Sequence, residues 1–342
     1  MTSSGETAPD VSIVVVNFQG GHAIAACLRS LFEDNTAGRE IIVVDNHSSD
    51  DSPAIIEKMV NQQDRGRWIA SPKNVGYAAA IDLARPLCRG RYIAVLNMDT
   101  VVEPGWLDPL VEHLDQHAEV AAASPLILLA DGKRVNAAGQ WVHRTGLGFN
   151  RDLGRPTAEI EADPFPVSGI HGAAFVIRSA LIDQIGGIES GGFLYHEDVN
   201  LSWLLHLMGY ELACVPVSRV RHDYFLSMHP EKLELLERNR EAMLRAYLQP
   251  KTRRGLIGWR TLTESILWLY SGLRGPRFLR AKWRARAWVH QNQALILQRR
   301  KLAERLRIRS DTEVLATTTR SYPLRQVLKL AGERGAPRRP LS

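Results

Sequence analysis

The sequence predicts an α/β fold with a largely parallel sheet, helices on both faces of that sheet, and a helical, basic region after it. Unbroken runs of β-branched residues, such as 11–16, are typical of strands buried on both faces. These runs alternate with segments of helical periodicity, as in α/β proteins. After residue 230 strand signals almost cease and basic residues dominate. With 342 residues, of which 45% are hydrophobic and 23% charged, the chain is not a wholly disordered protein.

The first part of the chain is predicted to consist of four strand–helix units. Within the segment 22–31, apolar residues recur at the spacing of one helix face. The helix predicted at 52–60 has Ser52 as a candidate N-cap and Pro53 at its first position. The predicted strands are 11–16, 41–44, 68–70 and 92–96, and the predicted helices are 22–31, 52–60, 76–87 and 106–117.

The rest of the chain is less regular. Residues 130–168 lack periodicity and are rich in Gly, Pro, Arg and Asp, which indicates an excursion with a mobile loop. Later predicted elements are a strand at 175–177, a helix at 198–208, a strand within 212–220 and a last strand at 312–319. We therefore divide the chain into a disordered N-terminus (1–10), an α/β domain (11–229), a helical region (230–331) and a disordered tail (332–342).

Polar side chains follow three of the predicted strands. Asn17 follows the first strand, Asp45 the second, and Asn97 with Asp99 the fourth. The carboxyl ends of parallel strands share one edge of a sheet, and ligands bind beyond that edge. Two oxygen-bearing side chains two residues apart, as Asn97 and Asp99 are, can reach one hard cation. The alternative is a plain strand-ending turn, because so short a motif is common by chance.

Three further places are candidates for chemistry. Asn74 and Gly76 open a predicted helix, where glycine permits close backbone approach and the helix start favours anions; the alternative is a plain turn. Glu197 and Asp198 also open a helix, where they either complement the helix dipole or supply a general base. His222 follows a predicted strand and is either structural or part of the polar edge.

Six blocks of the sequence, in order, resemble the motifs of family 2 inverting glycosyltransferases of the GT-A fold, close to their rhamnosyltransferase-like bacterial branch. The blocks lie at 14–19, 41–52, 74–82, 96–100, 172–201 and 215–222, so that the resemblance covers about residues 11–248. Six blocks in the right order are far more specific than any one of them. The chain departs from the family pattern at Asp51, Asp82, Met98 and Asn200, whereas the Glu197–Asp198 pair is intact.

The resemblance implies a Rossmann-like GT-A domain that moves a sugar from a nucleoside-diphosphate donor to an acceptor hydroxyl with inversion. It also implies roles for nine residues. Asn17 and Asp45 would line the pocket for the nucleotide base, and Asn74 with Gly76 would form the helix start near the donor. Asn97 and Asp99 would contact the donor diphosphate and a divalent cation (Mg²⁺ or Mn²⁺), and His222 would complete the metal shell. Asp198 would be the catalytic base, with Glu197 as its neighbour and the fallback candidate.

The resemblance further implies cell-surface polysaccharide synthesis, with rhamnose as the candidate sugar and a glycan or lipid-linked acceptor. The rival interpretation is a catalytically inactive sugar-nucleotide-binding or scaffold protein that uses its basic C-terminal region to bind nucleic acid or partners. The intact Glu197–Asp198 pair and the Asn97 and Asp99 side chains argue against that rival, and no nucleic-acid partner is expected.

The basic C-terminal region suggests a second role. Residues 230–342 hold 26 Lys and Arg against 9 Asp and Glu, a net charge of +17, whereas the whole chain carries +6. Between 281 and 306 apolar residues recur every seven positions. Three interpretations of this stripe remain open: packing on the α/β domain, pairing with another subunit in a homo-oligomer, or binding to an anionic membrane. Without a spanning segment or secretory signal, we expect a cytoplasmic protein, peripheral to the inner face of the cell membrane.

Overall fold

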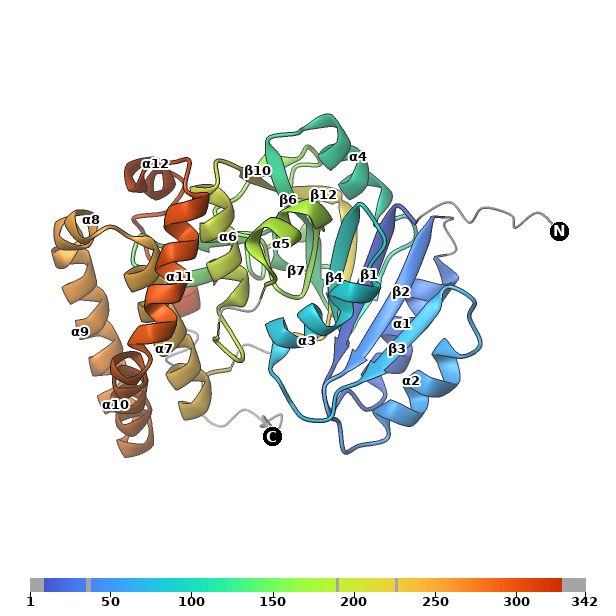
Figure 1. Ribbon diagram of the computed structural model, residues 1–342, viewed down its shortest axis with the longest axis horizontal. Helices are drawn as coiled ribbons and strands as arrows, with labels where there is room; N and C mark the ends of the chain where they lie inside the picture. The colour runs from blue at the N-terminus through green and yellow to red at the C-terminus, as the bar shows by residue number, and fades with distance from the viewer. Residues whose placement is uncertain (1–8, 35–37, 189–190, 225–226, 328–342) are drawn as a thin grey trace.

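Figure 1 shows a computed structural model of the protein, in which helices flank a central sheet and a helical region stands at one side. The structure describes residues 9–34, 38–188, 191–224 and 227–327. The tail predicted at 332–342, and all but two residues of the N-terminus predicted at 1–10, lie outside the described residues. The α/β fold with a mostly parallel central sheet and a helical C-terminal region is confirmed.

The central sheet has a purely parallel half and a mixed half. Its strands are β1 (Val11–Asn17), β2 (Arg39–Asp45), β3 (Gly66–Ala70), β4 (Tyr92–Asn97), β5 (Thr100–Val102), β6 (Val120–Leu129), β7 (Val135–Ala137), β10 (Phe165–Pro166), β11 (Ala174–Arg178) and β12 (Glu211–His222). In the parallel half the order is β3–β2–β1–β4, and Asn17 of β1 is in register with Asp45 of β2. The antiparallel strand β11 joins β4 to β6, which pairs in parallel with β12. A separate hairpin consists of β8 (Gln140–Val142) and β9 (Gly148–Asn150).

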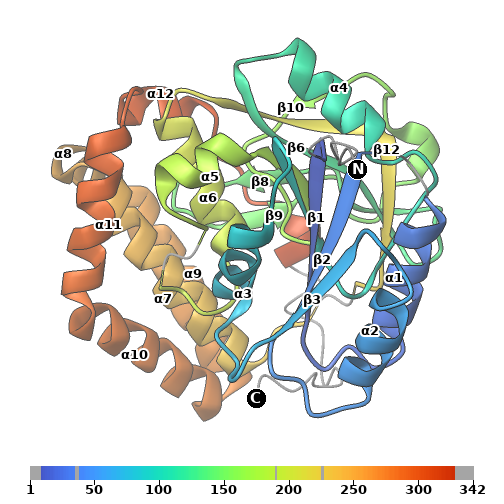
Figure 2. The same cartoon turned by 45° about the vertical axis from the view of Figure 1, so that its right-hand side comes forward.

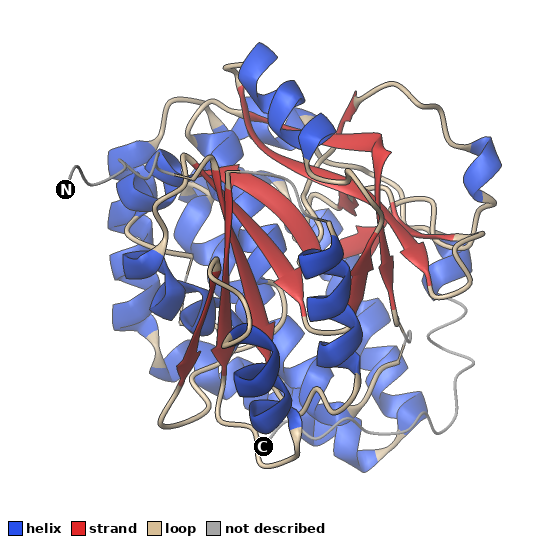
Figure 3. Ribbon diagram, turned by 90° about the vertical axis from the view of Figure 1, so that its right-hand side faces the viewer, coloured by secondary structure: helices blue, strands red, loops and turns tan. Residues whose placement is uncertain are grey.

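Helices cover both faces of the sheet, as Figure 3 shows. They are α1 (Ala23–Glu33), α2 (Ser52–Val60), α3 (Tyr77–Ala84), α4 (Asp108–Gln116), α5 (Ser179–Ile185), α6 (Glu197–Leu207), α7 (Pro230–Tyr247), α8 (Pro250–Gly255), α9 (Ile257–Arg274), α10 (Pro276–Gln291), α11 (Gln293–Leu306) and α12 (Asp311–Ala316). Alternate residues of β1 enter opposite cores: Ile13 and Val15 pack with α1, α2 and α4, whereas Val14 and Val16 share a core with α3, α5, α6 and α7. Burial of both faces explains why the strand has no polar residue facing solvent.

Four local predictions need correction. The strand predicted at 312–319 is wrong, because Ser310 caps the helix α12 there in a capping box with Glu313. The strand β6 and the helix α5 were not predicted, since a short apolar run does not distinguish a buried strand from a helix. The excursion at 130–168 contains the short strands β7 to β10. Ser52 lies inside α2, and Asp51 holds the N-cap position.

The apolar stripe predicted at 281–306 is split between α10 and α11 at Asn292 and faces inward. Val289, Ile296 and Ala303 are buried in the same core as α3, α6 and α7. The structure therefore supports the packing interpretation of this stripe, and Figure 2 shows α10 and α11 lining one side of the molecule. Among the described residues, no helix combines the length and hydropathy that crossing a bilayer requires.

All three cysteines of the chain are free thiols. Cys27 and Cys214 are buried and Cys88 is half-buried, so that they contribute to packing in the way small apolar residues do.

Candidate active site

The ends of β1 and β2 form a buried polar cluster. Asn17 Nδ2 donates hydrogen bonds to Asp45 Oδ1 at 2.7 Å, to Ser52 Oγ at 2.8 Å and to Ser48 Oγ at 3.1 Å. The other carboxylate oxygen of Asp45 accepts the backbone N–H of Ser48 at 3.0 Å. The parallel register of the two strands thus brings together the two side chains predicted for the base pocket.

Asn46, the residue after Asp45, ties this cluster to the start of α3. Its Nδ2 donates to Asn74 Oδ1 at 2.9 Å, and its Oδ1 accepts the backbone N–H of Val75 at 2.9 Å. Gly76 has a φ of +88°, and a Cβ atom there would lie 2.1 Å from the backbone oxygen of Phe193. Only glycine fits this close approach, so the turn at 74–76 is held against the loop that precedes the acid pair.

Asp99 and His222 meet because β12 pairs with β5, which places His222 opposite Thr100. Asp99 Oδ1 lies 3.3 Å from His222 Nε2, and both side chains are buried. His222 Nδ1 lies 2.9 Å from Asn136 Oδ1. Since an amide oxygen can only accept a hydrogen bond, Nδ1 carries the hydrogen and Nε2 faces the carboxylate.

This pair fits a divalent cation. Carboxylate oxygen and imidazole nitrogen are ligands that Mn²⁺ accepts, and a hydrogen bond such as that from His222 to Asn136 commonly orients a metal-binding histidine. The backbone N–H of Asn97, two residues before Asp99, donates to Ala173 O at 3.0 Å. Within the described ranges, no three His, Cys, Asp or Glu side chains gather closely enough to hold a metal ion by themselves.

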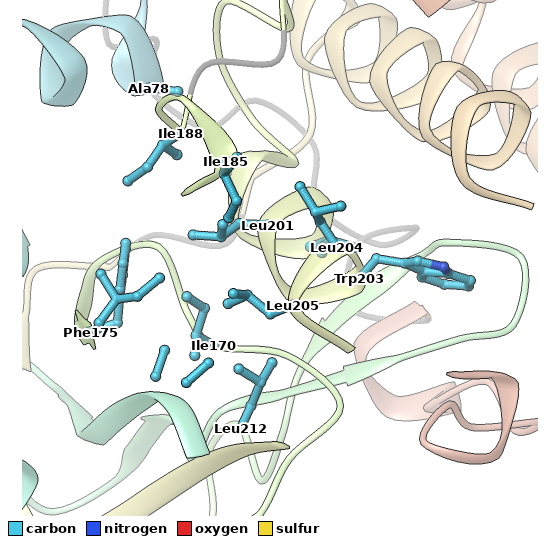
Figure 4. Close-up of a cluster of buried hydrophobic side chains, with 14 of the residues drawn as sticks. Ala78, Ile170, Phe175, Ile185, Ile188, Leu201, Trp203, Leu204, Leu205 and Leu212 are labelled. Carbon is cyan, nitrogen blue, oxygen red and sulfur yellow. The ribbon is translucent and has the colours of Figure 1, made fainter. Parts of the chain in front are cut away.

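The helix that carries the acid pair is fixed by the core. Every residue of α6 from Val199 to Leu207 is buried. Figure 4 shows side chains of α6, such as Leu201 and Leu205, packed with Ile170 and Phe175. Because truncating a buried leucine to alanine typically costs about 2–5 kcal/mol, this packing holds the first turn of α6 firmly in place.

Asp198 is bound from two sides in that first turn. Its Oδ2 accepts the backbone N–H of Gly172 at 2.9 Å and Nε2 of Gln140 at 2.8 Å, and its Oδ1 accepts the N–H of Val199 at 2.8 Å. Burial raises the pKa of Asp198 above its ordinary value, although these three hydrogen bonds oppose the rise. The result is a positioned carboxylate with a strengthened affinity for protons, as a general base requires.

Tyr77, the first residue of α3, connects the groups of the site. Its hydroxyl donates to Gly172 O at 2.8 Å, and the N–H of that same glycine donates to Asp198. Burial raises the pKa of Tyr77 well above its ordinary value, and the carboxylates of Glu197, Asp198 and Asp99 raise it further. Through Gly172, the hydroxyl of Tyr77 at the start of α3 is thus linked to the carboxylate of Asp198 at the start of α6.

The loop before α6 is strained and pinned by the C-terminal region. Phe193, Tyr195 and His196 have φ values of 67°, 64° and 73°, a left-handed conformation that costs non-glycine residues on the order of 1 kcal/mol each. Asn239 Nδ2 of α7 donates to the backbone oxygens of Gly192, Leu194 and Tyr195 at 3.0, 3.1 and 2.8 Å. The acid pair is thus held by a side chain from the region that the sequence set apart from the α/β domain.

Several functional candidates had no motif to reveal them. Gln140 and Asn239 lie in segments without a recognised block, and only tertiary packing brings them to the site. Tyr77 directly follows Gly76 within the block at 74–82, and this position was a signal that the sequence offered. His171 precedes Gly172; its ring lies 6.1 Å from that of His222, and burial lowers its pKa to about 3, so that it stays neutral.

The sequence is similar to those of two glycosyltransferases from Mycobacterium tuberculosis. A pre-mycofactocin glycosyltransferase of Mycobacterium tuberculosis is 28% identical over 225 residues, which are 65% of this chain and 44% of that protein. An N-acetylglucosaminyl-diphospho-decaprenol L-rhamnosyltransferase of the same organism is 25% identical over 233 residues, which are 61% of this chain and 75% of that protein. The chain therefore spans less than half of the first of these relatives.

Two solved structures share the fold. GalNAc-T7, determined with UDP, GalNAc and Mn²⁺, superposes with a TM-score of 0.65 at 17% identity, covering 91% of this chain and 56% of its own. The mannosyltransferase PcManGT of Pyrobaculum calidifontis, in complex with GDP-Man and Mn²⁺, gives 0.51 at 15% identity, covering 91% and 86%. These likenesses establish the GT-A fold. The family pattern described as Glycosyl transferase family 2 matches residues 12–186, and because this is more than half of the sequence, the chain belongs to glycosyltransferase family 2.

Proposed function

We propose that the protein is an inverting glycosyltransferase that moves a sugar from a nucleoside-diphosphate donor to an acceptor hydroxyl. The observation that carries this proposal is that Gly172 binds Asp198 through its N–H and Tyr77 through its carbonyl, while the ring of the preceding residue, His171, lies 6.1 Å from that of His222, which pairs with Asp99. A place for the donor diphosphate and a candidate base would then lie close together, as a single displacement requires. In this proposal residues 11–229 are the catalytic domain and 230–331 form a helical region that supports it.

The donor would bind along the carboxyl ends of the parallel strands. Asn17 and Asp45 would contact the base, while Asn74, Gly76 and Asn97 would lie near the ribose and diphosphate. The support for this assignment is the hydrogen-bonded chain that runs from β1 to the start of α3.

Asp99 and His222 would hold a divalent cation, Mg²⁺ or Mn²⁺, at the diphosphate. A cation bound there would offset the negative charge that develops on the leaving diphosphate. The support is the pairing of Asp99 Oδ1 with His222 Nε2, and the orientation that Asn136 imposes on the imidazole.

Asp198 would act as the general base. Its carboxylate would take the proton of the acceptor hydroxyl while that oxygen bonds to the anomeric carbon, and the bond from this carbon to the diphosphate oxygen breaks. Attack from the face opposite the leaving group inverts the configuration without a covalent enzyme intermediate. Its raised pKa favours this proton transfer, and Glu197 is the fallback base.

The acceptor would be a glycan or a lipid-linked glycan in cell-surface polysaccharide synthesis, at the cytoplasmic face of the membrane. The similarity to a rhamnosyltransferase whose name specifies a decaprenol-linked acceptor supports rhamnose as the first sugar to try. The intact acid pair beside the donor edge argues against the inactive scaffold.

Donor binding and transfer test the proposal directly. UDP-, GDP- and dTDP-linked sugars, dTDP-rhamnose included, are screened by thermal shift with and without Mn²⁺. A donor that binds selectively should raise the unfolding temperature by an amount that grows with its concentration over Kd. The product made with a polyprenyl-diphosphate acceptor is then analysed by NMR for its anomeric configuration. Retention of the donor's configuration, or no stabilisation by any nucleotide sugar, would contradict the proposal.

A further inference from the structure

The outer face of α9 is apolar and uncovered among the described residues. Its exposed large side chains are Ile257, Leu262, Ile266, Leu269 and Leu273, with exposed fractions of 64, 47, 37, 65 and 80%. The other exposed positions of the helix hold only glycine, threonine and serine. Six of the twelve exposed large hydrophobic side chains of the described residues lie on α9 and α10, which marks an interaction surface rather than scattered exceptions.

Two of the three charged side chains of α9 point to its other side, and the third, Arg274, lies over the rings of Tyr270 and Phe278. Arg260 pairs with Glu241 of α7 at 2.8 Å, and Glu264 accepts Arg240 at 2.7 Å. Glu264 is also the only carboxylate in the sequence between residues 250 and 291. The outer face of α9 therefore contains no charge that would oppose its burial in an apolar medium.

A basic rim borders this apolar row. On α10, which packs beside α9, the exposed side chains include Arg277, Arg280 and Arg286, and on α8 they include Lys251 and Arg254. Arg284 of α10 is also exposed, but it pairs with Glu234 of α7 at 2.7 Å. Trp283 of α10 is 63% exposed and packs edge-on against Trp268 of α9, with ring centroids 5.3 Å apart. Figures 1 and 2 place α10 at the edge of the molecule opposite α2.

We propose that this surface docks on an anionic lipid bilayer. We call it the α9 lipid face and define it by the aliphatic row Leu262, Ile266, Leu269 and Leu273, the tryptophan Trp283, and the basic rim Lys251, Arg254, Arg277, Arg280 and Arg286. An apolar row flanked by arginines, with a tryptophan at the boundary, matches the acyl region and the anionic headgroups of a membrane surface. The helix would lie parallel to the bilayer.

Charge decides between a lipid surface and a second copy of the chain. In a two-fold dimer the same face meets itself, so the rims on α8 and α10 would be brought close to each other. Since no carboxylate on α8, α9 or α10 is exposed, none of these three helices would compensate their repulsion. An anionic bilayer supplies the complementary charge.

The proposed membrane contact lies on α9 and its neighbours, not on the stripe at 281–306 that the sequence suggested. The stripe at 281–306 faces the core, and the apolar side chains that remain exposed belong mainly to α9. The inference concerns only the proposed location of the enzyme. Vesicle binding is measured without donor or acceptor, so that its failure and a failure of the proposed reaction are distinguishable.

The experiment compares variants of the full chain by co-sedimentation with phosphatidylglycerol-containing vesicles and with pure phosphatidylcholine vesicles, at low and high salt. One variant, Leu262→Ser/Leu269→Ser/Leu273→Ser, removes the apolar row, and Leu83→Ser/Val217→Ser/Leu324→Ser is its control at exposed positions elsewhere. A second variant, Arg254→Gln/Arg277→Gln/Arg280→Gln, removes part of the rim, and its control, Arg29→Gln/Lys58→Gln/Arg67→Gln, makes the same charge change on α1, α2 and β3.

We expect the wild type and both controls to prefer anionic vesicles. The rim variant should bind them at least about tenfold more weakly at low salt, and the row variant should lose the binding that persists at high salt. Equal binding of wild type to both vesicle types, or unchanged binding of both variants, would overturn the proposal. The proposal would also be overturned if the wild type did not bind vesicles but formed a dimer in solution that the row variant abolishes.

Discussion

The parallel half of the sheet and the C-terminal helices pack against the same core but place their charges in opposite ways. In β1, β2 and β4 the interior is aliphatic, and polar side chains such as Asn17 and Asp45 lie at the strand ends. In α7 and α10 the charges lie inside: Glu237, Arg240 and Lys282 are all buried and paired with one another. Asp45 is paired with neutral groups at its strand end, whereas the buried charges of α7 and α10 pair with opposite charges and hold these two helices together.

The largest effect is expected from removing the proposed catalytic base, Asp198. Asp198→Asn keeps the shape of the side chain but removes the base, so kcat should fall by about 10²–10⁴-fold while donor binding remains. Because burial raises the pKa of Asp198, wild-type kcat should also fall as the pH is lowered through that raised value. Steady-state kinetics across pH, with calorimetric donor titration, measure both.

Asp64→Asn, at an exposed position between α2 and β3, serves as the matched control and should leave kcat unchanged. Near-normal transfer by Asp198→Asn would assign the base to Glu197, which Glu197→Gln would then reveal.

The next effect tests the helical region alone. Glu237→Gln removes the carboxylate that Arg240 and Lys282 share. Because both cations then stay buried without it, the free energy of unfolding should fall by about 3–5 kcal/mol. The arginine and lysine hold the pKa of Glu237 near 2, below its ordinary 4.5, despite the opposing effect of burial. Stability from this group is therefore complete above pH 4.5 and is lost as the pH falls toward 2.

Denaturant unfolding at pH 7 and along an acid titration measures both properties of Glu237. Glu57→Gln on α2 is the control, since that side chain is exposed. An acid-unfolding curve in Glu237→Gln as steep as in the wild type would refute the assignment.

A smaller effect is expected at the proposed cation pair. Asp99→Ala and His222→Ala should each weaken Mn²⁺-dependent binding of a nucleoside diphosphate by at least about tenfold, because each removes a proposed ligand. Binding without the cation should change little. Calorimetry with Mn²⁺ and with EDTA separates the two quantities, and His113→Ala on α4 is the control histidine. Equal losses with and without Mn²⁺ would mean that the pair is structural.

The smallest effect connects the two regions. Asn239→Ala removes the donor that binds three carbonyl oxygens of the strained loop, so it should cost about 1–3 kcal/mol of stability and roughly tenfold in kcat, with donor Kd unchanged. Leu233→Ala, buried on the same helix, controls for destabilisation alone. If kcat falls equally in both variants, Asn239 only stabilises the fold and does not position the loop.

The sequence predicted well where one local pattern determines the structure. Runs of β-branched residues and the polar residues after them identified β1, β2 and β4, and hence the edge with Asn17, Asp45 and Asp99. It failed where tertiary contacts decide. Gln140 reaches Asp198 across 58 positions of the chain, a contact that no periodicity encodes.

The C-terminal helices show the same limit on a larger scale. Heptad spacing indicated that 281–306 is amphipathic, but spacing does not say which element covers the apolar side. Only the packing of Ile296 and Ala303 against the core, and the exposure of Leu269 and Leu273 on α9, distinguish the inner surface from the outer one.

The buried thiols have a practical consequence. Burial raises the pKa of Cys27 to about 12, of Cys88 to about 11 and of Cys214 to about 12, so that few thiolates form at neutral pH. Because the thiolate is the reactive form, maleimide reagents should modify the native chain slowly. A single cysteine introduced by Leu273→Cys on the exposed end of α9 would then carry a fluorophore or spin label without prior removal of the natural cysteines. The depth of that label in a bilayer could be read directly.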